Sequence, residues 1–192
     1  LHLRGGRNAI SKDAYPDMEA FWRDVAAAYR KAIAHLARAG CTYLQLDDTA
    51  FAYLCDPKIQ ENCRRNGDDP AKLPQRYADT INAALENRPA GMTVTMHTCR
   101  GNFKSAWVAE GGYDPVVEAM FSTDVDGYFM EFDSSRAGGF EPLRALPPGT
   151  GSLIVQSDAE GRFTFEDMEP GSYVLCVRAF GDDGMPLKLS AG

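Results

Sequence analysis

Hydrophobic residues recur at two different spacings along residues 1–149. From Pro16 and Asp17 to Gly40 they recur every three or four positions, which predicts an amphipathic helix that ends at the glycine. The apolar positions of this helix are Met18, Phe21, Trp22, Val25, Tyr29, Ala32, Ile33 and Leu36. Similar spacing predicts further helices over residues 57–65, 71–86 and 115–121.

Between the helices, apolar and polar residues alternate over short runs, which predicts strands. The runs are residues 1–3, 41–50, 92–99 and 125–133. Strands that alternate with helices form a parallel sheet covered by the helices, so the predicted fold class is α/β. The loops after the strands are long, as in (β/α)₈ barrels, where such loops build the active site.

The pattern changes after Gly151, where the helical spacing disappears. Short alternating runs follow at residues 152–157, 162–166 and 173–180, separated by turn-forming residues. They predict a short antiparallel β tail. We therefore expect two parts: residues 1–149, and a β-rich tail of residues 150–192 that could belong to a β-sandwich.

Candidate chemistry is concentrated at the ends of the predicted strands. His97 and Cys99 are two positions apart in T-V-T-M-H-T-C-R-G-N, so they project from the same face of a strand. Asp47 and Glu131 lie near the ends of the strands before and after. Imidazole, thiolate and carboxylate are zinc donors, and zinc ionises a bound thiol near neutral pH. The alternative is a buried thiol beside a hydrogen-bonded histidine; for Asp48 we expect only a capping role in the next turn.

Composition limits the classes of function. Hydrophobic residues make up 44% and charged residues 24% of the 192 positions, as in an ordinary globular protein. The net charge of −7 argues against non-specific nucleic-acid binding. No apolar run reaches the roughly 20 residues of a membrane span, and no signal segment stands at the start. With five irregularly spaced cysteines, these features predict a cytoplasmic protein without nucleic-acid or membrane partners.

Four motifs together resemble a known family. They are L-H-L-R-G-G-R, Y-L-Q-L-D-D-T, M-H-T-C-R-G-N and Y-F-M-E-F-D-S-S-R-A-G-G-F-E-P-L-R. They resemble the C-terminal catalytic domain of cobalamin-independent methionine synthase, and look closest to short relatives without the N-terminal domain. The resemblance covers residues 1–149 and implies a (β/α)₈ TIM barrel. In that family, zinc activates the thiol of homocysteine, which takes a methyl group from a methylated folate.

Carried over by residue, the resemblance implies that His97, Cys99 and Glu131 are zinc ligands. It also implies that Asp47 holds the amino group of the substrate. Only about four barrel strands are expected here, whereas a complete barrel takes about 250 residues. The family's fourth ligand, a cysteine, and its proton-donating histidine have no counterpart; Cys176 falls in an unrelated pattern, that of the tail. The tail resembles part of a carboxypeptidase-regulatory or prealbumin-like module.

Three functions remain open on this basis. The first is a zinc-dependent methyltransferase acting on a thiol such as homocysteine, incomplete in this chain. The second is a non-catalytic remnant fused to a β module, acting as a binding or structural module. The third is another thiol alkyl transfer of the coenzyme M type. An open barrel edge would also favour self-association, so we expect the isolated chain to be poorly active.

Overall fold

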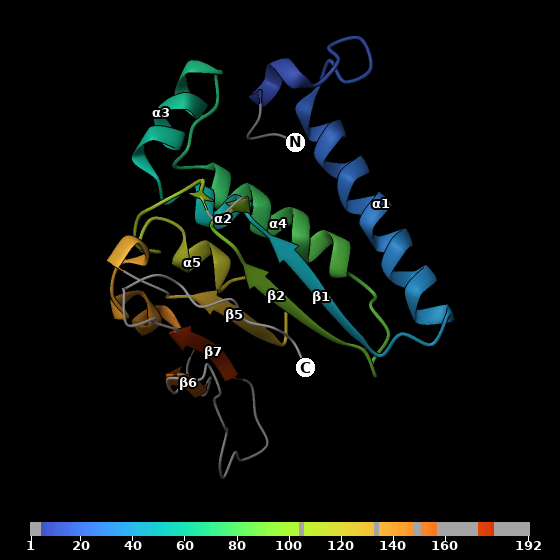
Figure 1. The fold of residues 1–192 in the computed structure, drawn as a ribbon. Coiled ribbons are helices and arrows are strands. Elements are labelled where there is room, and N and C mark those ends of the chain that lie inside the picture. Colours follow the sequence, from blue (N-terminus) through green and yellow to red (C-terminus); the bar gives the residue numbers. More distant parts are fainter. Residues whose placement is uncertain (1–4, 104–105, 133–134, 148–150, 157–172, 179–192) are drawn as a thin grey trace.

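The computed structural model describes residues 5–103, 106–132, 135–147, 151–156 and 173–178, and Figure 1 shows how they are arranged. The α-helices are α1 (Met18–Arg38), α2 (Ala50–Tyr53), α3 (Pro57–Arg65), α4 (Leu73–Leu85) and α5 (Val117–Met120). Short 3₁₀ helices are η2 (Gly6–Ala9), η3 (Ser135–Ala137) and η4 (Glu141–Ala145). The strands are β1 (Tyr43–Asp48), β2 (Thr93–Thr98), β3 (Asn102–Phe103), β4 (Ala106–Trp107), β5 (Gly127–Glu131), β6 (Gly151–Gln156) and β7 (Tyr173–Arg178).

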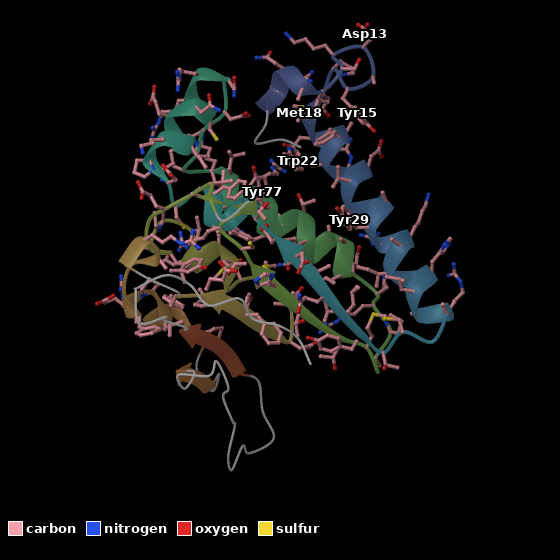
Figure 2. The ribbon with its side chains drawn as sticks, in the orientation of Figure 1. Asp13, Tyr15, Met18, Trp22, Tyr29 and Tyr77 are labelled. Carbon is pink, nitrogen blue, oxygen red and sulfur yellow. The ribbon has the colours of Figure 1, made fainter. Side chains whose placement is uncertain are left out.

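The long helix α1 begins and ends where its sequence predicts. The side chain of Asp17 accepts a hydrogen bond from the backbone N–H of Glu19 at 3.0 Å, which caps the first turn. Gly40 follows the helix with a φ of +93°, a left-handed conformation that favours glycine. Helix α1 packs against α4, and Figure 2 shows Trp22 and Tyr77 between the two helices, with ring centroids 5.9 Å apart.

The strands β1, β2, β5, β7 and β6 form one sheet in that order, and each neighbouring pair is parallel. Helices α2, α3 and α4 lie in the connection from β1 to β2, and α5 lies in the connection from β2 to β5. This arrangement confirms the predicted α/β class. In the register, Asp47 of β1 is opposite His97 of β2, and His97 is in turn opposite Phe129 of β5.

The two faces of the sheet differ in burial. One face carries the apolar side chains that pack with the helices into the core. On β2 and β5 these are Val94, Met96, Tyr128 and Met130, all buried. The opposite face is more polar and more open. On β1 it carries Tyr43, Gln45 and Asp47, all exposed, and on β2 it carries the half-buried His97.

The predicted antiparallel arrangement of the tail is wrong for the part that the structure describes. β6 and β7 pair in parallel, and β7 also pairs in parallel with β5. The connection between the two strands, residues 157–172, is longer than the dozen or so residues that a parallel crossover needs. Period-two alternation is common to parallel and antiparallel strands, so the sequence pattern did not specify the direction. The strands predicted over residues 1–3 and 162–166 lie outside the described residues.

Candidate functional site

The candidate site lies at the C-terminal ends of β1, β2 and β5, on the polar face of the sheet. Nδ1 of His97 is 3.4 Å from Oδ1 of Asp47, and Nε2 of His97 is 3.4 Å from Oε1 of Glu131. Gln45 donates a hydrogen bond of 2.8 Å to Oδ1 of Asp47. The structure therefore brings together three of the four side chains selected from the sequence, with the imidazole ring between two carboxylates.

The fourth side chain, Cys99, lies against the carboxylate of Glu131. Burial raises the pKa of the Cys99 thiol, and the nearby Glu131 carboxylate raises it further. The hydrogen bond with Glu131 raises the pKa of His97; burial opposes this, and the charges of Glu131 and Asp47 reinforce it. The backbone N–H of Cys99 donates to the carbonyl oxygen of Asp48 at 3.0 Å, which extends the pairing of β1 and β2 to the site.

The donors suit a zinc ion in type and partly in position. Two donors bound to one tetrahedral zinc, at about 2.0–2.2 Å each, lie about 3.3 Å apart. The 3.4 Å between Nε2 of His97 and Oε1 of Glu131 matches this spacing. However, within the described part of the chain, no group of three or more His, Cys, Asp or Glu side chains is arranged to hold a metal ion. Asp47 and Glu131 face opposite nitrogens of the ring, so they do not converge.

Two buried residues that the sequence analysis missed support the site from the covered face. The hydroxyl of Tyr113 hydrogen-bonds with Oγ1 of Thr98 and donates to the backbone carbonyl of Glu131, both at 3.2 Å. It thereby joins the ends of β2 and β5. The guanidinium of Arg100, fully buried, lies over the ring of Tyr113 at 4.4 Å from its centroid. Tyr113 follows two glycines and Arg100 precedes one, which indicates turns at both places. No spacing in the sequence indicates that the two side chains are in contact.

Asp48 has the capping role predicted for it. Its carboxylate accepts hydrogen bonds from the backbone N–H groups of Ala50, at 3.0 and 3.1 Å, and Phe51, at 3.3 Å, at the start of α2. Burial raises the pKa of Asp48 to about 6, and the two hydrogen bonds oppose that rise. Asp48 therefore points to the covered side of the sheet, away from His97.

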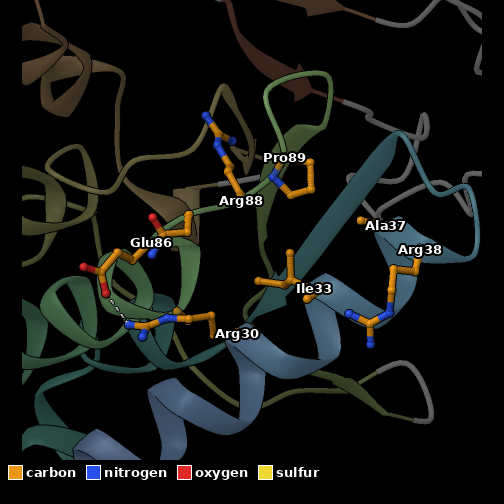
Figure 3. Close-up of a pocket in the computed structure, with 10 residues that line it drawn as sticks. Arg30, Ile33, Ala37, Arg38, Glu86, Arg88 and Pro89 are labelled. Atoms are coloured by element: carbon orange, nitrogen blue, oxygen red, sulfur yellow. Dashed lines mark ion pairs between the residues drawn. The ribbon is translucent and has the colours of Figure 1, made fainter.

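A cavity of about 510 Å³ lies at the other end of the strands, between α1 and the loop from α4 to β2. Figure 3 shows Arg30, Ile33 and Arg88 in its lining, with Arg30 paired to Glu86. Arg88 is itself bonded to Asp126 through two hydrogen bonds of 2.7 and 2.8 Å. These arginines are occupied by protein acceptors, and the cavity is separate from the candidate site.

Comparison with known proteins gives a resemblance at the level of a family. The chain is 49% identical over 151 residues to the uncharacterized protein YxjG of Bacillus subtilis, and 48% identical over 134 residues to YxjH of the same organism. These matches cover 78% and 69% of this chain, but it spans only 40% and 36% of the length of these relatives. No protein-family model matches the sequence.

One solved structure that is similar to this chain carries a name that states a reaction. It is a protein of Listeria monocytogenes provisionally named a vitamin-B12 independent methionine synthase. The two chains are 32% identical, with a TM-score of 0.55, over 86% of this chain and 39% of the other. The resemblance predicted from the four motifs is thus supported at the family level. Among the described helices, none has the length and apolar composition that a membrane span requires.

Proposed function

We propose that this chain carries the thiol-activating part of a zinc-dependent methyltransferase, which moves a methyl group from a methylated folate to a thiol such as homocysteine. The observation that carries the proposal is the contact of His97 with Glu131, with the Cys99 thiol against the same carboxylate. The three side chains come from the ends of two neighbouring parallel strands. The methionine synthase-like neighbour supports the type of reaction.

The proposed setting is part of a (β/α)₈ barrel. Parallel sheets are normally buried on both faces, yet β1 has exposed side chains on one face, at Tyr43, Gln45 and Asp47. In a barrel, this face would line the interior, and the strand ends would lie at the catalytic rim. We further propose that residues 1–149 form this unit and that residues 150–192 extend it.

His97, Cys99 and Glu131 would hold the zinc ion. Bound there, zinc would lower the pKa of a thiol substrate and hold it as a nucleophilic thiolate. The side chain of Asp47 is 74% exposed, so its carboxylate is accessible to the ammonium group of an amino-acid substrate. Tyr113 would keep the ends of β2 and β5 in register, which fixes the distance between His97 and Glu131.

Metal analysis of the purified chain tests the proposal. We expect one zinc per chain, lost in His97→Ala and in Cys99→Ala. His35→Ala and Cys41→Ala are matched controls because each removes the same donor type elsewhere, from the last turn of α1 and from the segment before β1. They should keep the metal. Addition of homocysteine should add sulfur to the coordination measured by X-ray absorption. Equal zinc content in all five proteins would refute the site.

A second candidate, for the 192 residues taken alone, is the non-catalytic remnant. The chain spans about two fifths of the length of its curated relatives, so groups needed for methyl transfer could lie outside the matched region. We expect the isolated 192-residue chain to bind zinc but to transfer methyl groups slowly. Methyl transfer by this chain at the rate of a complete relative would exclude the remnant.

A further inference from the structure

The ring of His97 has a different carboxylate at each nitrogen. Nε2 faces Glu131, which is also the side of Cys99, and Nδ1 faces Asp47. The contact with Asp47 arises from the sheet itself, because the two residues are opposite each other in the parallel register of β1 and β2. The orientation of the ring is therefore linked to the pairing of two strands.

A histidine that binds a metal through one nitrogen usually donates the N–H of the other to a carboxylate or carbonyl oxygen. A neutral imidazole has one donor and one acceptor nitrogen, so a bond to one fixes the role of the other. With its proton on Nδ1 directed at Asp47, a neutral ring has its lone pair on Nε2, on the side of Glu131 and Cys99, where a bound ion would replace the proton that Nε2 otherwise donates to Glu131. The opposite tautomer would direct a proton into the proposed metal site.

We propose that Asp47 is a positioning residue for the proposed metal site, accepting the Nδ1 proton of His97 and so presenting Nε2 to the ion. This inference rests on the proposed function. Gln45 fixes the carboxylate by donating 2.8 Å to Oδ1, the oxygen that faces His97. Among the described residues, Oδ2 of Asp47 has no hydrogen-bond donor, so it remains available for a ligand. One carboxylate could thus contact both a substrate ammonium group and a metal ligand.

The test compares Asp47→Asn with Asp79→Asn. The control is closely matched because Asp79, exposed on α4, accepts a hydrogen bond of the same 2.8 Å from the side chain of Gln75. In Asp47→Asn the side chain loses its charge, and its amide oxygen is a weaker acceptor for the Nδ1 proton than the carboxylate is. Zinc affinity, measured by competition with a chelator, should fall about 10- to 100-fold in Asp47→Asn. It should stay unchanged in Asp79→Asn.

The second readout needs no metal. In the metal-free protein, ¹H–¹⁵N NMR of the imidazole should show a downfield Nδ1 proton for His97, assigned by its loss in His97→Ala. It should keep its position in Asp79→Asn and move upfield in Asp47→Asn, because a neutral acceptor forms a weaker hydrogen bond than a carboxylate. An unchanged Nδ1 resonance in Asp47→Asn would overturn the inference, even if zinc affinity fell, because loss of charge alone would lower affinity.

The two proposals fail in different ways. Absence of zinc from the wild-type chain, together with an Nδ1 proton that depends on Asp47, would refute the metal site and leave the positioning intact. Normal zinc binding, with neither readout altered in Asp47→Asn, would refute the positioning and leave the metal site intact.

Discussion

The substitution Asp48→Asn tests how the raised pKa of Asp48, next to the candidate site, changes the stability of the protein with pH. Burial raises the pKa of Asp48 to about 6, from 3.8 for a free side chain. The folded protein therefore keeps this proton to a higher pH than the unfolded chain does. By linkage, the stability from Asp48 is fully present below about pH 4 and is lost as the pH rises through 6.

The magnitude follows from the pKa difference. Each pKa unit corresponds to about 1.4 kcal/mol, so complete burial would give a loss of about 3 kcal/mol. Asp48 is only half-buried, and solvent screening reduces the expected loss to about 1–2 kcal/mol. The amide introduced by Asp48→Asn cannot ionise and keeps one oxygen to accept from Ala50 or Phe51. We therefore expect the variant to be more stable than the wild type at pH 7 by about 1–2 kcal/mol.

Urea denaturation of both proteins between pH 4 and pH 7.5 measures this effect. The difference in free energy of unfolding should grow with pH in favour of Asp48→Asn and level off above pH 7. Asp48→Ala serves as the control because it removes the charge and the cap together, at a cost of about 0.5–2 kcal/mol for the cap. A stability difference between wild type and Asp48→Asn that does not vary with pH would refute the reasoning.

Three further predictions concern one buried side chain and two ion pairs. Met96 is fully buried, so Met96→Ala should lower the free energy of unfolding by about 2–4 kcal/mol in urea, and Met96→Leu by less than about 1.5. Burial alone would raise the pKa of Asp126, but hydrogen bonds from Arg88 and from the Val94 backbone lower it. Asp126→Asn should therefore cost about 1 kcal/mol near neutral pH, a difference that closes as the pH falls towards 3 in thermal melts. The exposed pair of Arg76 and Glu19, with N–O distances of 2.8 and 2.6 Å, should couple by about 0.5 kcal/mol in a double-mutant cycle, and a value of zero would contradict this.

The sequence allowed prediction of the features that depend on local spacing. The three- and four-residue recurrence of apolar residues located α1, and Asp17 and Gly40 located its ends. Period-two alternation predicted that His97 and Cys99 share a face, and in the structure both lie beside Glu131. The contacts of His97 with Asp47 and Glu131 depend in addition on how β2 pairs with β1 and β5.

The features that the sequence did not predict are those set by contacts between distant segments. The direction of β6 and β7 depends on how the connection between them runs, and alternation carries no information on it. Arg100 and Tyr113 are separated by the segment that contains β3 and β4, and their contact arises only when the chain folds back to the end of β2. Likewise, which carboxylate each nitrogen of His97 faces is set by the pairing of β2 with β1 and β5.

The pairing of β7 with β5 bears on how this protein should be dissected. Glu131 is opposite Val177 in that pair, so the strand that carries one proposed ligand has a neighbour from the far end of the sequence. Cutting the chain at residue 150, the boundary predicted from the change in hydrophobic spacing, would remove that neighbour and leave the backbone of β5 open to unintended strand pairing. A fragment prepared to isolate the proposed metal ligands would thus lose part of the sheet that orients them, so functional studies should begin from a chain that retains residues 151–178.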